Sequence, residues 1–134
     1  MRVPARGEFR HQSRKFLHFS EQSVRACGLE PQQHQLLLAL KGGGGDETTI
    51  GYLAERLQIR HNSAVELIDR MADHGHVRRV PSPGDKRCVV VQLTRSGNAV
   101  LGTLSAEHVR ELQQTGPPLV DALEALLPAL RDAG

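Results

Sequence analysis

The chain has 134 residues, the length of one ordinary domain, and a formal net charge of only +2. Hydrophobic residues make up 39% of it, but aromatic residues only 3% and Trp is absent, so a core must be built from aliphatic side chains. No apolar run approaches the ~18 residues of a membrane span, and no apolar segment follows the basic start, Met1–Arg6, as a secretory signal requires. We therefore expect a cytoplasmic protein without membrane partners, and the two cysteines, Cys27 and Cys88, do not make a disulfide framework.

Two helices are expected in the N-terminal third. The first runs from about Glu8 to Cys27 and ends at Gly28, and the second runs from about Pro31 to Lys41. Glycines at 42–45 then make a flexible connection. A phosphate-binding loop is not expected there, because residues 46–47 are acidic where such a loop carries a cation.

Residues 49–94 predict a winged helix-turn-helix. Apolar residues recur twice at helical spacing, at Ile50, Leu53, Ala54 and Leu57 and again at Ala64, Leu67, Ile68 and Met71. Only residues 58–61 lie between the two helices, a connection typical of a helix-turn-helix, and Thr49 is a suitable N-cap for the first of them. β-Branched runs at 76–80 and 88–93, separated by Pro-Ser-Pro-Gly, predict two strands and a wing tip. A unit of this kind binds DNA by laying its second helix in the major groove.

The C-terminal third predicts two more helices. The first runs from about Arg95 to Gln114 and should stop at residues 116–118, Gly-Pro-Pro, because proline lacks an amide and clashes with the preceding turn. The second runs from about Pro118 to Arg131 and carries an apolar stripe of Leu119, Val120, Leu123, Leu126, Leu127 and Leu130. Packing across a two-fold axis would bury this stripe, and so would folding back onto the chain's own core.

The chain also resembles the MarR family of transcriptional regulators. The matching positions are Leu53-Ala54-Glu55-Arg56-Leu57, Ser63, Leu67-Ile68-Asp69-Arg70-Met71, Gly75, Val77, and above all Asp85-Lys86-Arg87 followed by Val89-Val90-Val91-Gln92-Leu93-Thr94 and Gly97. The resemblance covers about residues 8–115. It implies a homodimer that represses transcription and releases double-stranded DNA when a small-molecule effector binds.

Together these signals predict one domain over residues 1–134, mainly α with a small β-hairpin wing. Residues 30–95 should form the winged helix-turn-helix core, and residues 8–27 and 96–132 the N- and C-terminal dimerisation helices. From Thr48 to Arg95, eight Lys or Arg residues face five Asp or Glu residues, a net charge of +3, whereas residues 96–134 carry a net charge of −3. A basic unit beside an acidic segment suits a polyanionic partner on one side only, here a near-palindromic DNA operator.

The candidate DNA contacts are Arg60, His61, Asn62, Ser63, Glu66, Arg70, Asp85, Lys86 and Arg87. Arg and His donate to guanine or phosphate, Asn pairs with adenine, and Glu accepts from cytosine. Arg70 is expected at a phosphate or in an ion pair with Asp69 or Asp73. Asp85 and Arg87 are expected to share one face of a strand start. By the resemblance, Asp85 braces the wing while Arg87 enters the minor groove; the alternative is a surface ion pair worth ~0–1 kcal/mol.

Other functions find less support in the sequence. No two histidines have a metal-binding helical spacing and no cysteine lies near a histidine at ligand spacing, so neither a metal nor a cofactor is expected. No nucleophile or nucleotide-loop motif indicates an enzyme. By the resemblance, an effector pocket would lie among the first, second and fifth helices and the winged unit, with Phe16, His34 and Leu38 as candidate lining residues. The remaining alternative is a winged-helix protein-interaction module with little DNA affinity, against which Arg60, Lys86 and Arg87 argue.

Overall fold

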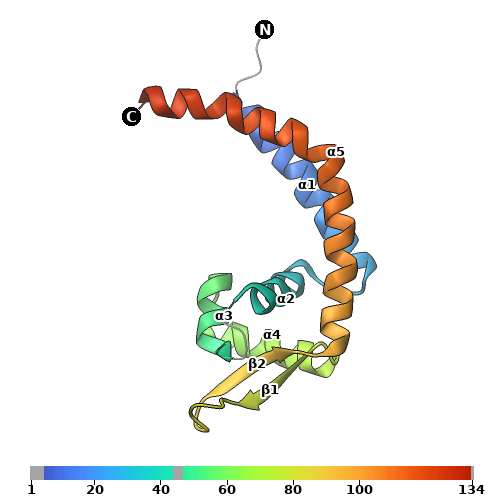
Figure 1. Ribbon diagram of the computed structural model, residues 1–134, viewed down its shortest axis with the longest axis vertical. Coiled ribbons are helices and arrows are strands. Elements are labelled where there is room, and N and C mark those ends of the chain that lie inside the picture. Colours follow the sequence, from blue (N-terminus) through green and yellow to red (C-terminus); the bar gives the residue numbers. More distant parts are fainter. Residues whose placement is uncertain (1–4, 44–46, 134) are drawn as a thin grey trace.

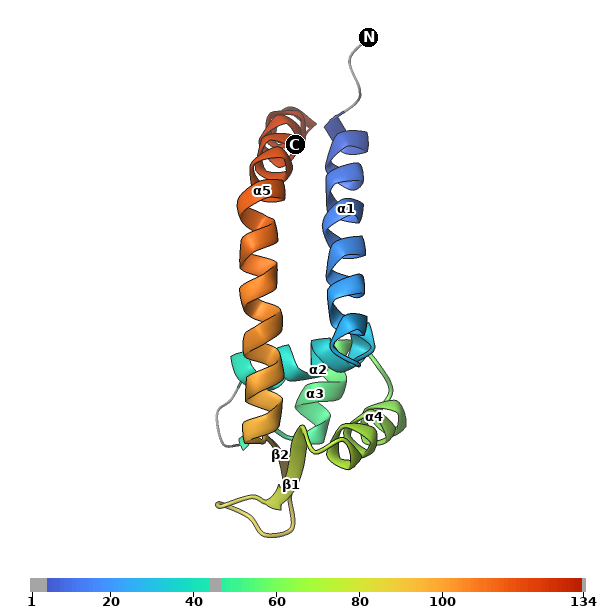
Figure 2. The same cartoon turned by 90° about the vertical axis from the view of Figure 1, so that its right-hand side faces the viewer.

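The computed structural model describes residues 5–43 and 47–133 of the chain. The elements follow in the order α1 (Ala5–Ala26), α2 (Pro31–Gly42), α3 (Ile50–Leu57), α4 (His61–Asp73), β1 (Val77–Pro81), β2 (Val89–Leu93) and α5 (Arg95–Ala133). The helices α1 and α5 lie side by side and form an arched stalk, while α2 to β2 form a head at one end of it (Figures 1 and 2). Helix, turn, helix and hairpin follow one another in the head, so the predicted winged helix-turn-helix fold is confirmed.

Local sequence signals explain where the helices of the head begin and end. Thr49 caps α3 as predicted, because its hydroxyl accepts the amide of Tyr52 at 3.1 Å. Glu30 and Gln33 form a reciprocal capping box at the start of α2. Gln58 ends α3 in the left-handed conformation with a φ of 56°, which turns the chain into α4 at His61.

The core is aliphatic, as the composition requires. Val24, Leu36, Leu37, Leu53, Ile68, Met71, Val91 and Leu104 are among its buried members. The antiparallel strands pair Val77 with Leu93 and Pro81 with Val89, so each strand begins one residue later than predicted. The segment before α3 adds a short bridge to β2, in which the amide of Val91 donates to the carbonyl of Thr48 at 2.8 Å.

Several hydrogen bonds join the head to the first turn of α5. The Thr94 hydroxyl donates to the Gly75 carbonyl at 2.6 Å, and the Thr94 amide donates to the His76 carbonyl at 3.1 Å. The same hydroxyl accepts the amide of Gly97 at 3.0 Å in the first turn of α5. A Cβ on Gly97 would lie 2.1 Å from the His76 carbonyl oxygen, so only glycine fits this approach.

The predicted break in the C-terminal third was wrong. Residues 95–133 form one helix that contains Pro117, Pro118 and Pro128 (Figure 1). The φ angle of proline suits a helix, and the clash of its ring with the preceding turn is relieved when the helix bends. Figure 1 shows that α5 curves along its length rather than ending, and this course keeps Ala122 buried.

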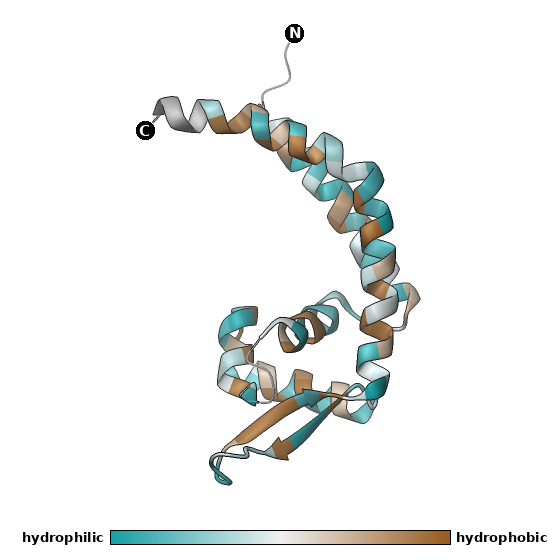
Figure 3. Cartoon of the chain, in the orientation of Figure 1, coloured by the Kyte–Doolittle hydropathy of each residue, from teal (hydrophilic) through white to brown (hydrophobic). Residues whose placement is uncertain are grey.

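The apolar stripe of the C-terminal third is only partly covered by the single chain. Val120, Leu123 and Leu127 are 51%, 40% and 38% exposed, whereas Leu119 and Leu126 are half-buried. The side chain of Leu130 lies outside the described residues. Along the part of α5 that is farthest from the head, Figure 3 shows hydrophobic segments alternating with polar ones. Among the described residues, no helix has both the length and the apolar character that crossing a membrane requires.

Candidate nucleic-acid interface

The start of α4 faces solvent. Its N-cap residue is Arg60, whose guanidinium has no acceptor, so the first amides of the helix are left without a cap from this side chain. Arg60, His61, Asn62 and Ser63 are all exposed. Open amides at the positive end of a helix dipole favour an anion such as a phosphate.

The sequence pattern gives α4 one buried and one exposed face. Ala64, Leu67, Ile68 and Met71 are buried against the core. Asn62, Glu66 and Arg70, each four residues apart, are exposed and lie along one side of the helix. The structure therefore brings the candidate contacts of α4 together on a single surface.

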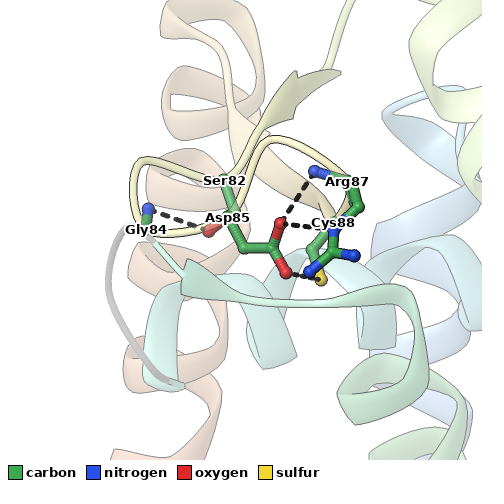
Figure 4. A network of polar contacts seen from close by, with 5 residues as sticks. All are labelled: Ser82, Gly84, Asp85, Arg87 and Cys88. Carbon is green, nitrogen blue, oxygen red and sulfur yellow. Dashed lines mark hydrogen bonds and ion pairs between the residues drawn. The ribbon is translucent and has the colours of Figure 1, made fainter.

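The wing tip is a closed turn, and the prediction that it begins a strand was wrong. The amide of Cys88 donates to the carbonyl of Asp85 at 2.9 Å, and β2 begins only at Val89. Asp85 and Arg87 meet through this turn instead of along a strand face (Figure 4). The Asp85 Oδ1 accepts the backbone amide of Arg87 at 3.0 Å and its Nε at 3.3 Å. Even so, the Arg87 side chain is 92% exposed.

The electrostatics of the turn favour a charged carboxylate. Hydrogen bonds from the amide of Arg87, and then from its side chain, lower the pKa of Asp85. The Asp85 charge in turn raises the pKa of the neighbouring Cys88 thiol, whose Sγ lies 3.7 Å from Oδ2. Asp85 thus holds both backbone and side chain of Arg87, while Lys86 and most of the Arg87 guanidinium stay open to solvent.

The ion pair on α4 involves a residue that was not among the candidates. Asp69 pairs with Arg79 of β1, with 2.6 Å between Oδ1 and Nη2. Arg70 is exposed and makes no ion pair among the described residues, so it pairs with neither Asp69 nor Asp73. Arg78 and Arg79 are adjacent and look equivalent in the sequence, but Arg78 instead donates to Gln92 across the hairpin at 3.2 Å.

The candidate effector-lining residues separate into two places. Phe16 of α1 and His34 of α2 both lie against the ring of His108 in α5, with centroid distances of 5.9 and 5.2 Å. Leu38, one turn further along α2, lines a different hollow of about 260 Å³ against α3. His108 was not a candidate, because its only sequence signal is that it shares a helical face with Leu101, Leu104 and Leu112.

The His34–His108 contact lies where α2 meets the stalk. The Nδ1–H of His108 donates to the Leu104 carbonyl at 2.6 Å, so the Nε2 of the neutral ring accepts the Ser20 hydroxyl at 2.7 Å, and the ring is bonded to both stalk helices. His34 is 4% exposed. Burial, and then the nearby His108, lower the pKa of His34, so the folded protein favours the neutral ring.

His34 should therefore make the folded state less stable in acid. The unfolded chain takes up the proton first, so the free energy of unfolding should fall as the pH drops below about 6.5 and through the lower folded pKa. Urea titrations from roughly pH 7.5 to 5.5 should show a smaller fall for His34→Gln than for the wild type. His18→Gln, which makes the same replacement at an exposed histidine of α1, is the matched control. An unchanged pH dependence in His34→Gln would show that His34 does not titrate in this way.

Comparison with known proteins adds a family relationship to this geometry. A family model described as the MarR family matches residues 28–87. The transcriptional activatory protein BadR of Rhodopseudomonas palustris is 35% identical over 89 residues, covering 66% of this chain and 51% of BadR. The HTH-type transcriptional regulator PecS of Dickeya dadantii is 31% identical over 78 residues, covering 58% of this chain and 47% of PecS. The chain thus spans about half the length of these curated relatives.

The fold likeness extends over nearly the whole chain. A mutant MarR from E. coli complexed with operator DNA superposes with a TM-score of 0.72 at 22% identity, covering 98% of this chain and 94% of that one. The apo form of wild-type MarR gives a TM-score of 0.73 at 21% identity, covering 99% and 98%. At this level of identity the likeness shows a common fold, stalk helices included.

Proposed function

We propose that the chain is a MarR-family protein and that it is a homodimeric transcriptional regulator that binds a specific DNA sequence. The observation that carries the proposal is that α4 and the wing tip lie at the same end of the molecule, with Asn62, Glu66 and Arg87 open to solvent (Figure 2). The MarR fold that superposes on this chain is one found bound to operator DNA, which supports a nucleic-acid partner.

Each part of the surface has a distinct proposed role. The first turns of α4 enter the major groove, where Asn62 and Glu66 meet base edges and Arg60, His61 and Ser63 contact bases or phosphates. Arg70 contacts a phosphate. The wing tip follows the backbone, with Lys86 at a phosphate and Arg87 in the minor groove, where charge and groove width matter more than base identity. Asp85 holds Arg87 in place for this contact.

The stalk is the proposed dimerisation region. Residues 8–27 and 96–132 would pack against their counterparts about a two-fold axis and cover Val120, Leu123 and Leu127, which the single chain leaves exposed. Residues 30–95 form the DNA-binding core of each protomer. Two-fold symmetry then requires a near-palindromic site, with half-site centres about 10 bp apart or a small multiple of that.

Repression is the proposed outcome where the operator overlaps a promoter, because bound protein excludes polymerase from the same DNA. The name of the BadR relative describes an activatory protein, so the position of the operator would set the sign of regulation. An effector that releases DNA would act at the junction of α1, α2 and α5, where Phe16 and His34 both contact the ring of His108.

The test is selection of DNA by the 134-residue chain, followed by anisotropy titrations. Selected duplexes should share a near-palindrome, and their affinity should fall steeply between roughly 50 and 200 mM salt, because neutralised phosphates release counterions. A scrambled duplex of equal length should bind much more weakly. A protein that selects no sequence, or whose binding is flat across this salt range, would contradict the proposal.

A further inference from the structure

Arg79 joins the wing to α4. Its Nη2 lies 2.6 Å from the Asp69 Oδ1 and 3.4 Å from the Val65 carbonyl oxygen, to which it donates. Val65 and Asp69 are one helical turn apart, so the guanidinium lies along the side of α4. Within the hairpin, Arg79 of β1 is paired with Val91 of β2, in the middle of both strands.

The other basic side chains of the hairpin are held differently. Arg78 bonds to Gln92 within the hairpin, and Arg87 is held by Asp85 at the tip. Buried Val77, Val90 and Val91 hold one face of the hairpin on the core, and the last pair before the tip is Pro81 with Val89. A two-stranded ribbon twists readily, and Arg79 adds a polar contact to α4 two residues before β1 ends at Pro81.

We propose that Asp69 and Arg79 form a positioning pair, which fixes the angle between α4 and the wing so that both reach their grooves of one DNA site together. This inference rests on the proposed DNA-binding function. Neither residue needs to touch a base. The pair acts by setting the position of the wing relative to α4, because one DNA site must accept the contacts of both at the same time.

Positioning by the pair and simple electrostatics predict opposite changes in affinity for the selected site when the charge of Asp69 is removed. Asp69 is an acidic group on the surface that would face a polyanion, so its removal by itself should strengthen binding to any DNA. If the pair positions the wing, Asp69→Asn should instead weaken binding to the selected site, while binding to scrambled DNA stays equal or becomes tighter. Asp73→Asn is the matched control, because Asp73 is an exposed acid one turn further along α4 and makes no ion pair among the described residues.

The experiment measures anisotropy of the wild type, Asp69→Asn, Arg79→Gln, the double variant and Asp73→Asn on the selected and scrambled duplexes. We expect Asp69→Asn and Arg79→Gln each to lower the ratio of specific to non-specific affinity by about tenfold, and Asp73→Asn to leave it unchanged. The double variant has the wild-type net charge. It should therefore regain the wild-type affinity for scrambled DNA but keep the lowered ratio of specific to non-specific affinity. The factor by which this ratio falls should equal that of either single variant, rather than the product of the two, because both substitutions break the same contact.

Hydroxyl-radical and methylation footprints separate positioning from a general loss of stability. In Asp69→Asn the minor-groove protection by the wing should weaken, while the major-groove protection by α4 persists. Parallel tightening of Asp69→Asn and Asp73→Asn on both duplexes, or an unchanged ratio in all variants, would overturn the inference although DNA binding stands. A wild type that selects no site would instead contradict the proposed function itself.

Discussion

Val120→Glu combined with Leu123→Glu should convert a dimer into a monomer and lower affinity for the selected DNA by about a hundredfold or more. These side chains are 51% and 40% exposed in the single chain, so two glutamates there should leave its fold intact while placing charge in the proposed interface. A monomer binds one half-site at a time and loses the high effective concentration that joins the two binding events.

Sedimentation at micromolar concentration checks the oligomeric state, and anisotropy checks the affinity. Leu38→Glu is the matched control, because Leu38 is also 40% exposed but lies on α2, outside the stalk. It should leave the dimer intact. A folded monomer that binds the selected site as tightly as the wild type would contradict dimerisation through the stalk.

The second large effect is expected at the wing. Arg87→Ala should weaken binding to selected and scrambled duplexes alike, by about tenfold, and reduce the slope of affinity against salt by about one phosphate contact. The reason is that the minor groove offers little base information, so this arginine acts through charge and groove width. Asp85→Ala should weaken binding in the same direction although it removes a negative charge, because Arg87 loses the carboxylate that holds it.

Two further variants show whether the effect of Arg87→Ala comes from the contact of the wing with DNA. Arg110→Ala removes an exposed arginine of α5, away from the wing, and should have little effect. Asn62→Ala should change base preference at one position of each half-site by on the order of 1–3 kcal/mol, without the uniform loss. If Arg87→Ala leaves both affinities within about 0.5 kcal/mol of the wild type, the wing makes no contact with DNA.

The head could be predicted because its signals are local. Helical spacing located α3 and α4, the hydroxyl of Thr49 located a helix start, and the β-branched runs located the hairpin. These features depend on residues within a turn or two of one another, so a short window of sequence contains their cause. The exposed face of α4 followed from the same spacing, which is why its candidate contacts lie together.

The features that the sequence did not predict depend on residues far apart in the chain, or lie at positions where two local signals favour different structures. The contacts of Arg79 with Asp69 and of His34 with His108 join different elements, and no periodicity indicates them. Pro117 and Pro118 signal the end of a helix, yet α5 continues through both, because a bend of the helix relieves the clash of the proline ring. At the wing tip, a turn closed by Cys88 and Asp85 occupies residues whose pattern also suits a strand.

The bonded joint at Thr94 and Gly97 makes the head and the near part of α5 move as one body. Because α5 has 39 residues, it is about 58 Å long at 1.5 Å per residue, and a rotation of about 5° at one end displaces the other by about 5 Å. That displacement exceeds the rise of about 3.4 Å between successive base pairs. In the proposed dimer, a small change in how the stalks pack would therefore shift each head by more than one base-pair step, so the packing of α5 would limit the operator spacing that the two heads can span.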